Sequence, residues 1–536
     1  MAEVTRRNFL RGGVIGAAAL GAAALVGCSP STSESSDKEK GTDGTSTDWL
    51  GEKPTLTPED CESTVEVDVL VVGAALAGSM AAYGAMRNGA KVAVIERNGA
   101  AHCGGMEASF VSSKYQLESG IPEYDKIWLA NTLMNYMQFR ADMSLIAVWC
   151  ERSGAIFDDL RETVLDPYGA YYEAKSLEGL FPDVKQELCQ YVSTGIAFST
   201  TDTMEPFTDT MHQWIEDNGG TIDYHTRAEV LVHDDAGEVV GAIATNADGK
   251  NVYYHAAKGV VMCTGSFGAN EAMVRHFYPS RYAEWALPKN SYNAYMTKPV
   301  DEVMDDGLGH RMLCWEGAQM EEVCSAQSWG IAGYLGFPYL IVNANGERFM
   351  NECTSNLISS HIVANQPGEN SYVWQIVPTN DFQMPTNFGF TLEFVRDAMH
   401  ALDGEHYEAD TIEGLAEKIQ CDPATLKATV DRYNEMCAAG EDTDYLKAKR
   451  YLDAVNDPPY VAWKVPYGFF CTTAGVQCDT KLEVLDADGK PIPGLYAAGN
   501  TVGYRFGSNY QTLVHGHTNS YAMTHGYIAG ESAAKR

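Results

Sequence analysis

The chain has 536 residues, of which 45% are hydrophobic and 21% are charged, and its formal net charge is -34 at pH 7. This length is enough for two or three packed domains. The acidic balance repels phosphate backbones and anionic lipid, so we expect no nucleic-acid partner. It would suit a basic redox partner, although solubility alone explains it. The 13 cysteines include no CxxC pair, so we predict no zinc ribbon, no other metal site and no thioredoxin-like site.

The N-terminus resembles an export signal. TRRNFLR at residues 5–11 is similar to a twin-arginine motif, and an Ala- and Gly-rich apolar stretch follows at 14–26. The stretch is shorter than the roughly 20 apolar residues of a spanning helix. It ends in LVGC, which resembles a lipobox with Cys28 as the lipidated residue. We expect residues 1–28 to be a twin-arginine lipoprotein signal that anchors the chain on the extracytoplasmic face of the cell membrane.

Residues 29–60 are rich in Ser, Thr, Asp, Glu and Lys and contain few apolar residues. Such a segment cannot bury enough surface to fold, which predicts a flexible tether.

A dinucleotide-binding fingerprint follows the tether. VEVDVLVV at residues 65–72 predicts a buried strand, and the turn GAALAG at 73–78 leads into a helix at 79–88. A second strand at 91–95 ends on Glu96. Strand, tight turn, helix and an acid about 20 residues further on are typical of this fingerprint.

Each residue type of the fingerprint has a physical task. Gly73 permits the turn, Gly78 permits close helix packing, and the helix N-terminus offers N–H groups to a pyrophosphate. Glu96 would accept hydrogen bonds from the ribose hydroxyls of an adenosine. Ala75 replaces the middle glycine of the motif, which narrows the approach of the pyrophosphate by one methyl group.

Further segments repeat the pattern of strands that end on glycine. A GGM turn occurs at residues 104–106, and AEVLVHDDAGEVVGAIA at 228–244 predicts a hairpin. A strand at 259–265 ends in Thr-Gly, and another at 494–500 runs into Gly499.

From Val67 onward the chain resembles the FAD-binding fumarate reductase and ketosteroid dehydrogenase superfamily. The similar pieces are VVGAALAG, the GGM turn, VVMCTGSFGAN, LIVNANGERFMNE, TTAGVQCDTKLEVL and IPGLYAAGNTVG. The resemblance implies an α/β fold in which a doubly wound, Rossmann-like FAD domain carries an inserted α+β capping domain. It places the FAD domain at 61–285 and 455–536 and the cap at 286–454, where cap closure would exclude water from the reacting centre.

The cofactor contacts expected from these segments come from the fingerprint, the glycine turns, the hairpin and the C-terminal region. They are Gly73, Ala74, Ala75, Leu76, Ala77, Gly78, Glu96, Arg97, Gly104, Gly105, Met106, Glu229, Val230, Thr264, Gly265, Gly499, Asn500, Leu513 and Val514.

The residues that bind and protonate carboxylates in fumarate reductases are replaced. The arginine proton donor that follows the G-x-R-F-x-N-E motif falls on Asn356, which has no usable proton at neutral pH. The family's H-G-x-N-R pattern becomes FGSNY at residues 506–510, and the His-Pro-Thr element of the cap becomes VCSA at 323–326. These three losses argue against reduction of fumarate or urocanate.

The C-terminal segment is more similar to the ketosteroid dehydrogenase branch. Its glycine-asparagine-threonine element matches Gly499-Asn500-Thr501, and the tyrosine that hydrogen-bonds a substrate carbonyl matches Tyr510. The family's Tyr-Pro-Gly is here Tyr510-Gln511-Thr512. A phenol polarises a carbonyl and donates a proton without carrying charge into an apolar pocket.

The second proton donor is expected in the loop GYLGFPY at residues 333–339. Tyr334 is favoured, because Tyr339 begins the apolar strand YLIVN and is expected in the core. His515 and His517 would contact flavin or substrate, or serve packing. Arg505 is the candidate carboxylate anchor for an acidic substrate.

These features predict an exported FAD-dependent oxidoreductase that reduces or desaturates a carbonyl-activated C=C bond of a largely neutral enone, steroid or phenolic. Two alternatives stay open, a reductase of an α,β-unsaturated carboxylic acid and a non-catalytic flavin electron-transfer or ligand-binding lipoprotein. The chain has no second fingerprint for NAD(P)H and no CxxCH haem motif. We therefore expect an external electron donor, a membrane-linked cytochrome or flavoprotein.

Overall fold

The computed structural model describes residues 49–536 except 106, 175–194, 199–203, 278–304, 322–325, 329–338, 353–361, 363–364, 368–372, 379–405, 466–468, 508–513 and 515. The expected export signal, Cys28 and most of the tether lie outside this range. Among the described residues, no helix has both the length and the apolar character that a membrane crossing requires.

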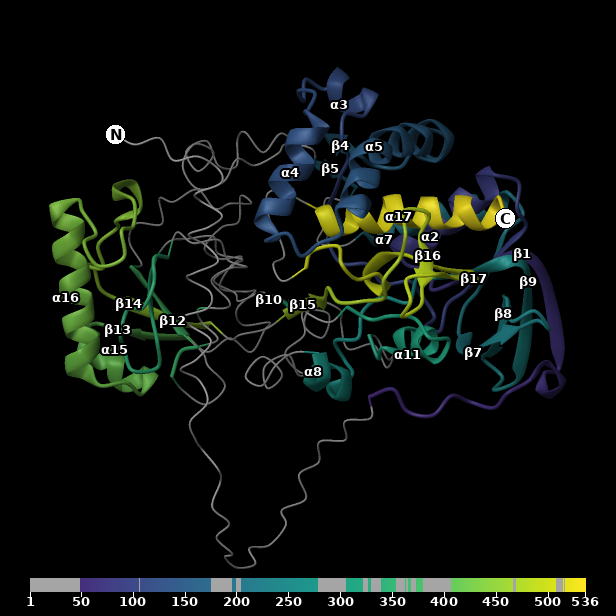
Figure 1. The fold of residues 1–536 in the computed structure, drawn as a ribbon. Coiled ribbons are helices and arrows are strands. Elements are labelled where there is room, and N and C mark those ends of the chain that lie inside the picture. Colours follow the sequence, from purple (N-terminus) through teal and green to yellow (C-terminus); the bar gives the residue numbers. More distant parts are fainter. Residues whose placement is uncertain are drawn as a thin grey trace, which may run out of the picture. The chain divides into compact units, whose positions relative to one another are not determined.

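An eight-stranded sheet carries the fold (Figure 1). Five strands run parallel in the order β6-β2-β1-β9-β17. Strand β16 pairs antiparallel with β17, β8 pairs antiparallel with β9, and β7 pairs antiparallel with β8. The strands are β1 (Ser63–Val72), β2 (Val92–Ile95), β6 (Thr221–Asp223), β7 (Arg227–His233), β8 (Val239–Thr245), β9 (Asn251–Met262), β16 (Glu483–Leu485) and β17 (Pro491–Ala497). The two fingerprint strands and the hairpin predicted from the sequence are confirmed.

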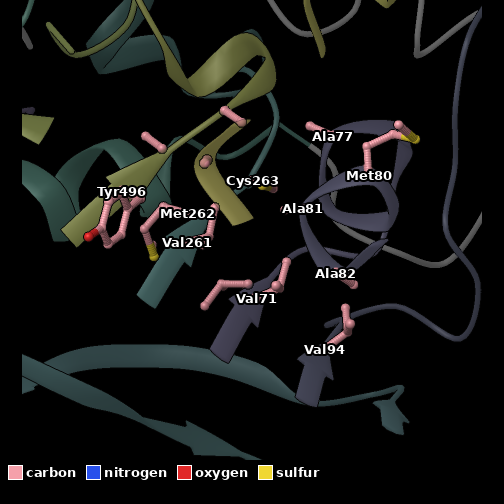
Figure 2. Close-up of a cluster of buried hydrophobic side chains, with 14 of the residues drawn as sticks. Val71, Ala77, Met80, Ala81, Ala82, Val94, Val261, Met262, Cys263 and Tyr496 are labelled. Carbon is pink, nitrogen blue, oxygen red and sulfur yellow. The ribbon is translucent and has the colours of Figure 1, made fainter. Parts of the chain in front are cut away.

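Helices pack on this sheet and complete its core. They are α2 (Leu76–Arg87), α7 (Glu205–Asp217), α8 (Glu271–Phe277), α11 (Leu308–Trp315) and α17 (His517–Ala534). Figure 2 shows side chains of α2 and of β1, β2, β9 and β17 in one buried cluster. The predicted α/β fold with a parallel, doubly wound core is confirmed.

The backbones of helices α2 and α17 approach each other closely because small residues line the contact on both helices. A Cβ on Gly530 would lie 1.9 Å from the Ala81 carbonyl oxygen, and one on Gly84 would lie 2.2 Å from that of Tyr527. The C-terminal helix is thereby fixed against the fingerprint helix, which places the C-terminal segment beside the fingerprint.

A helical insertion follows β2. Its elements are β3 (Glu107–Ser109), α3 (Lys114–Glu118), α4 (Lys126–Tyr136), α5 (Met143–Leu160), the π-helix η2 (Arg161–Leu165), α6 (Asp166–Tyr168), β4 (Glu173–Ala174) and β5 (Gly195–Ala197). β5 pairs with both β3 and β4. Asp125 and Asp142 cap α4 and α5 by accepting hydrogen bonds from first-turn N–H groups.

A second unit has its own core. The antiparallel sheet β11-β12-β14-β13 packs against two helices. The elements are β11 (Leu340–Val342), β12 (Val373–Pro378), β13 (His406–Ala409), β14 (Tyr460–Val465), α15 (Ile412–Ile419) and α16 (Pro423–Ala439). A separate short sheet joins β10 (Ala326–Ser328) to β15 (Phe469–Thr472). We propose that the four-stranded sheet with its two helices is the inserted cap that the resemblance implies.

The packing differs from the expected boundaries at three places. Met312 of α11 lies in the core of the large sheet, and β14 belongs to the cap sheet. We therefore propose that the cap lies between residues 322 and 465.

Residues 49–60, expected in the tether, include Trp49, whose ring lies 5.0 Å from that of Phe277. An aromatic ring supplies apolar surface that can be buried on folding.

A buried ion network stabilises the cap. Arg348 of the G-E-R-F-M-N-E motif donates to Glu352 at 2.8 and 2.9 Å and to Asp442 at 2.7 Å. The Asp442 carboxylate also accepts the backbone N–H groups of Asp444, Tyr445 and Lys447, each at 3.0 Å. Both carboxylate side chains are fully buried.

Asp442→Asn should lower the free energy of unfolding by about 3 kcal/mol at pH 7, because it leaves Arg348 buried with less than its full countercharge. Urea unfolding measures this loss, and Asp444→Asn at an exposed ion pair should change stability by less than about 1 kcal/mol. The bonds to Arg348 and to the backbone lower the pKa of Asp442 against the effect of its burial. Its contribution is therefore complete above the ordinary carboxyl pKa and is lost only as the pH falls through the lowered value. Equal effects of the two variants would contradict this account.

Candidate functional site

The turn after β1 is a close backbone crossing. Gly73 has φ +99°, and a Cβ there would lie 2.3 Å from the Cys263 carbonyl oxygen at the end of β9. A Cβ on Gly78 would lie 1.8 Å from the Gly73 carbonyl oxygen. Both glycines are thus required by contacts, as the fingerprint predicts.

The start of α2 offers backbone donors at this turn. Its N-cap residue is Ala75, which supplies no side-chain acceptor. The Leu76 N–H lies 3.2 Å from Cys103 Sγ, and burial raises the pKa of the Cys103 thiol to about 12. The sulfur is therefore neutral, and the helix terminus keeps the positive potential that suits a pyrophosphate.

Glu96 closes the other side of the turn. Its carboxylate accepts the N–H of Ala74 and that of Asn98, both at 3.0 Å. Each carboxylate oxygen has a further lone pair, so Glu96 can also accept the ribose hydroxyls for which it is predicted.

A cavity of about 130 Å³ opens at the carboxyl ends of β1, β2 and β9. Topology predicts a ligand at this edge of an open parallel sheet. The lining includes Gly73, Ala75, Glu96, Arg97, Thr264 and Gly265 of the expected cofactor contacts.

Other expected contacts lie beside this cavity. A Cβ on Gly499 would lie 2.8 Å from Ala77 Cβ on α2, and Thr501 Oγ1 accepts the Thr264 N–H at 3.0 Å. Asn519 at the start of α17 donates from Nδ2 to the carbonyl oxygens of Gly104 and Glu107, at 3.4 and 3.0 Å. The fingerprint, the glycine turn and the C-terminal segment therefore meet.

Some predicted contacts lie elsewhere or outside the described residues. Val230 is buried in β7, and Glu229 pairs with Arg227 at 3.0 Å; neither lines the cavity. Val514 is buried against the helical insertion. Met106 and Leu513 lie outside the described residues.

The cavity has walls that the sequence interpretation missed. Apart from Val72, Ile95 and Cys263 at the strand ends, they are Asn98, His102, Thr226, Arg227, Ala228, Asp305, Asp306, Leu308, Gly309 and Met312. The sequence does hold a sign of the last five residues. The segment DDGLG at 305–309 leads into an apolar helix. The resemblance places this segment in the cap, because it puts the start of the cap at residue 286.

An ion pair spans the cavity wall. Arg97 Nη1 lies 2.6 Å from Asp306 Oδ2, and both side chains are partly exposed. Asp306 also accepts the N–H of Leu308 at the start of α11.

Arg97→Ala should weaken FAD binding only about threefold, because a partly exposed pair contributes less than about 1 kcal/mol. Flavin fluorescence titration at low and high salt measures the affinity, and the difference between variant and wild type should shrink with salt. A loss above about 30-fold would show that the Arg97 guanidinium pairs with a charged group of the cofactor and not only with Asp306.

Arg505 is fully buried in the loop after β17. Its Nε donates to the Val502 carbonyl oxygen at 2.7 Å, and its Nη2 donates to Asn500 Oδ1 at 3.0 Å. Glu321, which accepts the Tyr504 N–H at 2.8 Å, stands nearby. Burial raises the pKa of Glu321 to about 8 against the opposing effect of Arg505. The guanidinium thus orders the segment that holds Asn500.

Phe506, which the sequence resemblance matches to a carboxylate-binding histidine, is fully buried. Its ring lies 5.8 Å from that of His517, which also packs 4.3 Å from Trp149 and 4.1 Å from Tyr521. Burial lowers the pKa of His517 well below its usual value, so this imidazole is neutral.

The predicted proton-transfer residues Tyr510 and Tyr334 lie outside the described residues, as do Asn356 and His515. Tyr339 is buried, with 1% of its surface exposed, which agrees with the core position expected for it.

A glycine turn at the end of a parallel strand, an uncapped helix start and a buried acid for a ribose are the parts of an FAD-binding domain. Residues 68–512 match the FAD binding domain family, and the chain belongs to it. FAD is its cofactor, and the predicted class of FAD-dependent oxidoreductase is confirmed.

Known proteins of both predicted branches are similar to the chain. A probable fumarate reductase of Shewanella frigidimarina is 27% identical over 87% of this chain and 74% of that one. Digoxin reductase of Eggerthella lenta is 25% identical over 93% and 91%. A 3-ketosteroid delta1-dehydrogenase of Sterolibacterium denitrificans shares the fold with a TM-score of 0.70, at 20% identity over 88% and 99%. The superfamily resemblance predicted from the sequence is confirmed.

Proposed function

We propose that the protein reduces, or in the reverse direction desaturates, a carbonyl-activated C=C bond of a largely neutral substrate such as an enone, a steroid or a phenolic. The observation that carries this proposal is the state of the carboxylate-binding positions. Phe506 is a fully buried aromatic at the position where the resemblance leads us to expect a carboxylate-binding histidine, and the Arg505 guanidinium is bonded within its own loop. Two of the five guanidinium N–H donors are thereby used within the loop that holds Asn500.

Bound FAD, when reduced, supplies a hydride to the β carbon. In the proposed reaction the Tyr510 hydroxyl donates a hydrogen bond to the substrate carbonyl and stabilises the enolate oxygen. Tyr334 delivers a proton to the α carbon, which completes the addition of two hydrogens across the double bond. Tyr510 keeps its proton throughout, whereas Tyr334 is left as a phenolate that takes up a proton from solvent before the next turnover.

We further propose that the protein works on the extracytoplasmic face of the membrane, held by a lipid on Cys28. Its electrons would come from a membrane-linked cytochrome or a flavoprotein. The support is the order of signal, lipobox and tether at the N-terminus, together with the missing NAD(P)H fingerprint.

Turnover with a reduced viologen dye tests the function on a panel of fumarate, cinnamate and an enone steroid. We expect turnover of the neutral enone and none of fumarate. Turnover of the acids alone would favour the α,β-unsaturated acid reductase. Bound flavin that no acceptor on the panel reoxidises would favour an electron-transfer or ligand-binding protein.

A further inference from the structure

We propose that His212, which lies on α7 and outside the fingerprint, is a positioning residue for the cofactor pyrophosphate. Its imidazole joins the fingerprint turn to the loop that walls the adenosine side of the cavity. Nε2 lies 2.8 Å from the Ala74 carbonyl oxygen, and Nδ1 lies 2.8 Å from the Tyr224 hydroxyl. His212 is 7% exposed and Ala74 is fully buried.

The partners determine the tautomer. A carbonyl oxygen can only accept, so Nε2 carries the proton and donates to Ala74. Nδ1 of the neutral ring is then an acceptor, and the Tyr224 hydroxyl donates to it. Ser79 Oγ donates to the same carbonyl oxygen at 2.9 Å, so that oxygen is held from two sides.

The peptide plane transmits this constraint to the cofactor site. In a trans peptide the C=O of Ala74 and the N–H of Ala75 point in opposite directions. Holding the carbonyl toward His212 therefore aims the Ala75 N–H away from α7, and Ala75 lines the cavity. Glu96 fixes the preceding N–H of Ala74 at 3.0 Å, so the donor geometry of the turn is set on both sides.

The Tyr224 end of the hydrogen-bonded chain Ala74–His212–Tyr224 is also part of the site. Tyr224 follows β6, where the Glu96 N–H donates to the Asp223 carbonyl oxygen at 2.9 Å and the Thr226 N–H donates to that of Glu96 at 2.8 Å. Thr226 lines the cavity. His212 therefore couples the pyrophosphate turn to the adenosine wall.

The test compares His212→Phe, Tyr224→Phe and the double variant in the full-length chain after reversible removal of FAD. Flavin fluorescence gives the Kd of FAD, and ADP and adenosine serve as competing probes. We expect His212→Phe to weaken FAD and ADP by the same factor, about 10-fold for one buried hydrogen bond. Adenosine should weaken by less than about twofold, because it lacks the diphosphate.

Tyr224→Phe should weaken FAD binding about threefold, and the double variant should bind no worse than His212→Phe, because Tyr224 acts through the imidazole. His255→Phe, at a surface pair with Glu66, is the control and should leave the Kd unchanged. An unchanged Kd in His212→Phe, an equal loss for adenosine, or multiplying effects in the double variant would overturn the proposal. If His212→Phe does not fold, Tyr224→Phe alone tests the proposal. An unchanged FAD affinity in Tyr224→Phe would then contradict a positioning role for His212.

Discussion

Gly78→Ala should lower the affinity for FAD about 100-fold and destabilise the FAD domain by about 3 kcal/mol. The added Cβ would lie 1.8 Å from the Gly73 carbonyl oxygen and 2.9 Å from its carbonyl carbon, so backbone and not a flexible side chain must move. The movement separates α2 from the turn that presents its N–H groups to the pyrophosphate.

The control lies in the same strand-helix-strand unit. Gly89 follows α2 with φ +81°, and a Cβ there would meet nothing within 4 Å. Gly89→Asn should bind FAD as the wild type does, because asparagine tolerates this backbone conformation. FAD titration and urea unfolding of both variants measure the effects. Equal FAD affinities in Gly78→Ala and wild type would show that the pyrophosphate does not depend on this turn.

Tyr510→Phe should lower kcat for an enone about 100-fold to 1000-fold while KM changes little, because the hydroxyl stabilises charge that develops on the carbonyl oxygen only in the transition state. Reduction of the bound flavin by dithionite should be unaffected. Steady-state turnover with a reduced dye gives both constants.

The matched control is Tyr339→Phe, which removes a hydroxyl from a buried tyrosine at the edge of the cap sheet. It should retain turnover within about threefold of wild type, since it is expected to pack and not to react. Full activity in Tyr510→Phe, or an equal loss in both variants, would remove Tyr510 from the proposed mechanism.

The fingerprint could be predicted because its residues are adjacent in the sequence and each has one physical task. A continuous apolar run defines β1. Gly73 and Gly78 are required because an added Cβ would lie 2.3 and 1.8 Å from backbone carbonyl oxygens. The hairpin of β7 and β8 was equally local, since Asp-Asp-Ala-Gly separates two alternating runs.

The missed parts depend on contacts between distant segments. His212 bonds to Ala74 across 138 positions and resembles any histidine on an amphipathic helix. Asp306 lines the cavity because α11, which follows it, packs in the core of the large sheet. It lies 209 positions after Arg97, in a segment that the resemblance places in the cap. The buried hydrogen bonds of Arg505 could not be inferred either. From the sequence alone, an arginine in this loop is as typical of a carboxylate anchor as of a residue that orders its own loop.

Reoxidation of the reduced enzyme tests the central claim most directly. The bound flavin is reduced without oxygen, and the return of oxidised-flavin absorbance is followed after mixing with an enone steroid or with fumarate. The proposed function predicts rapid, saturable reoxidation by the enone and none by fumarate. Rapid reoxidation by fumarate with no response to the enone would contradict it.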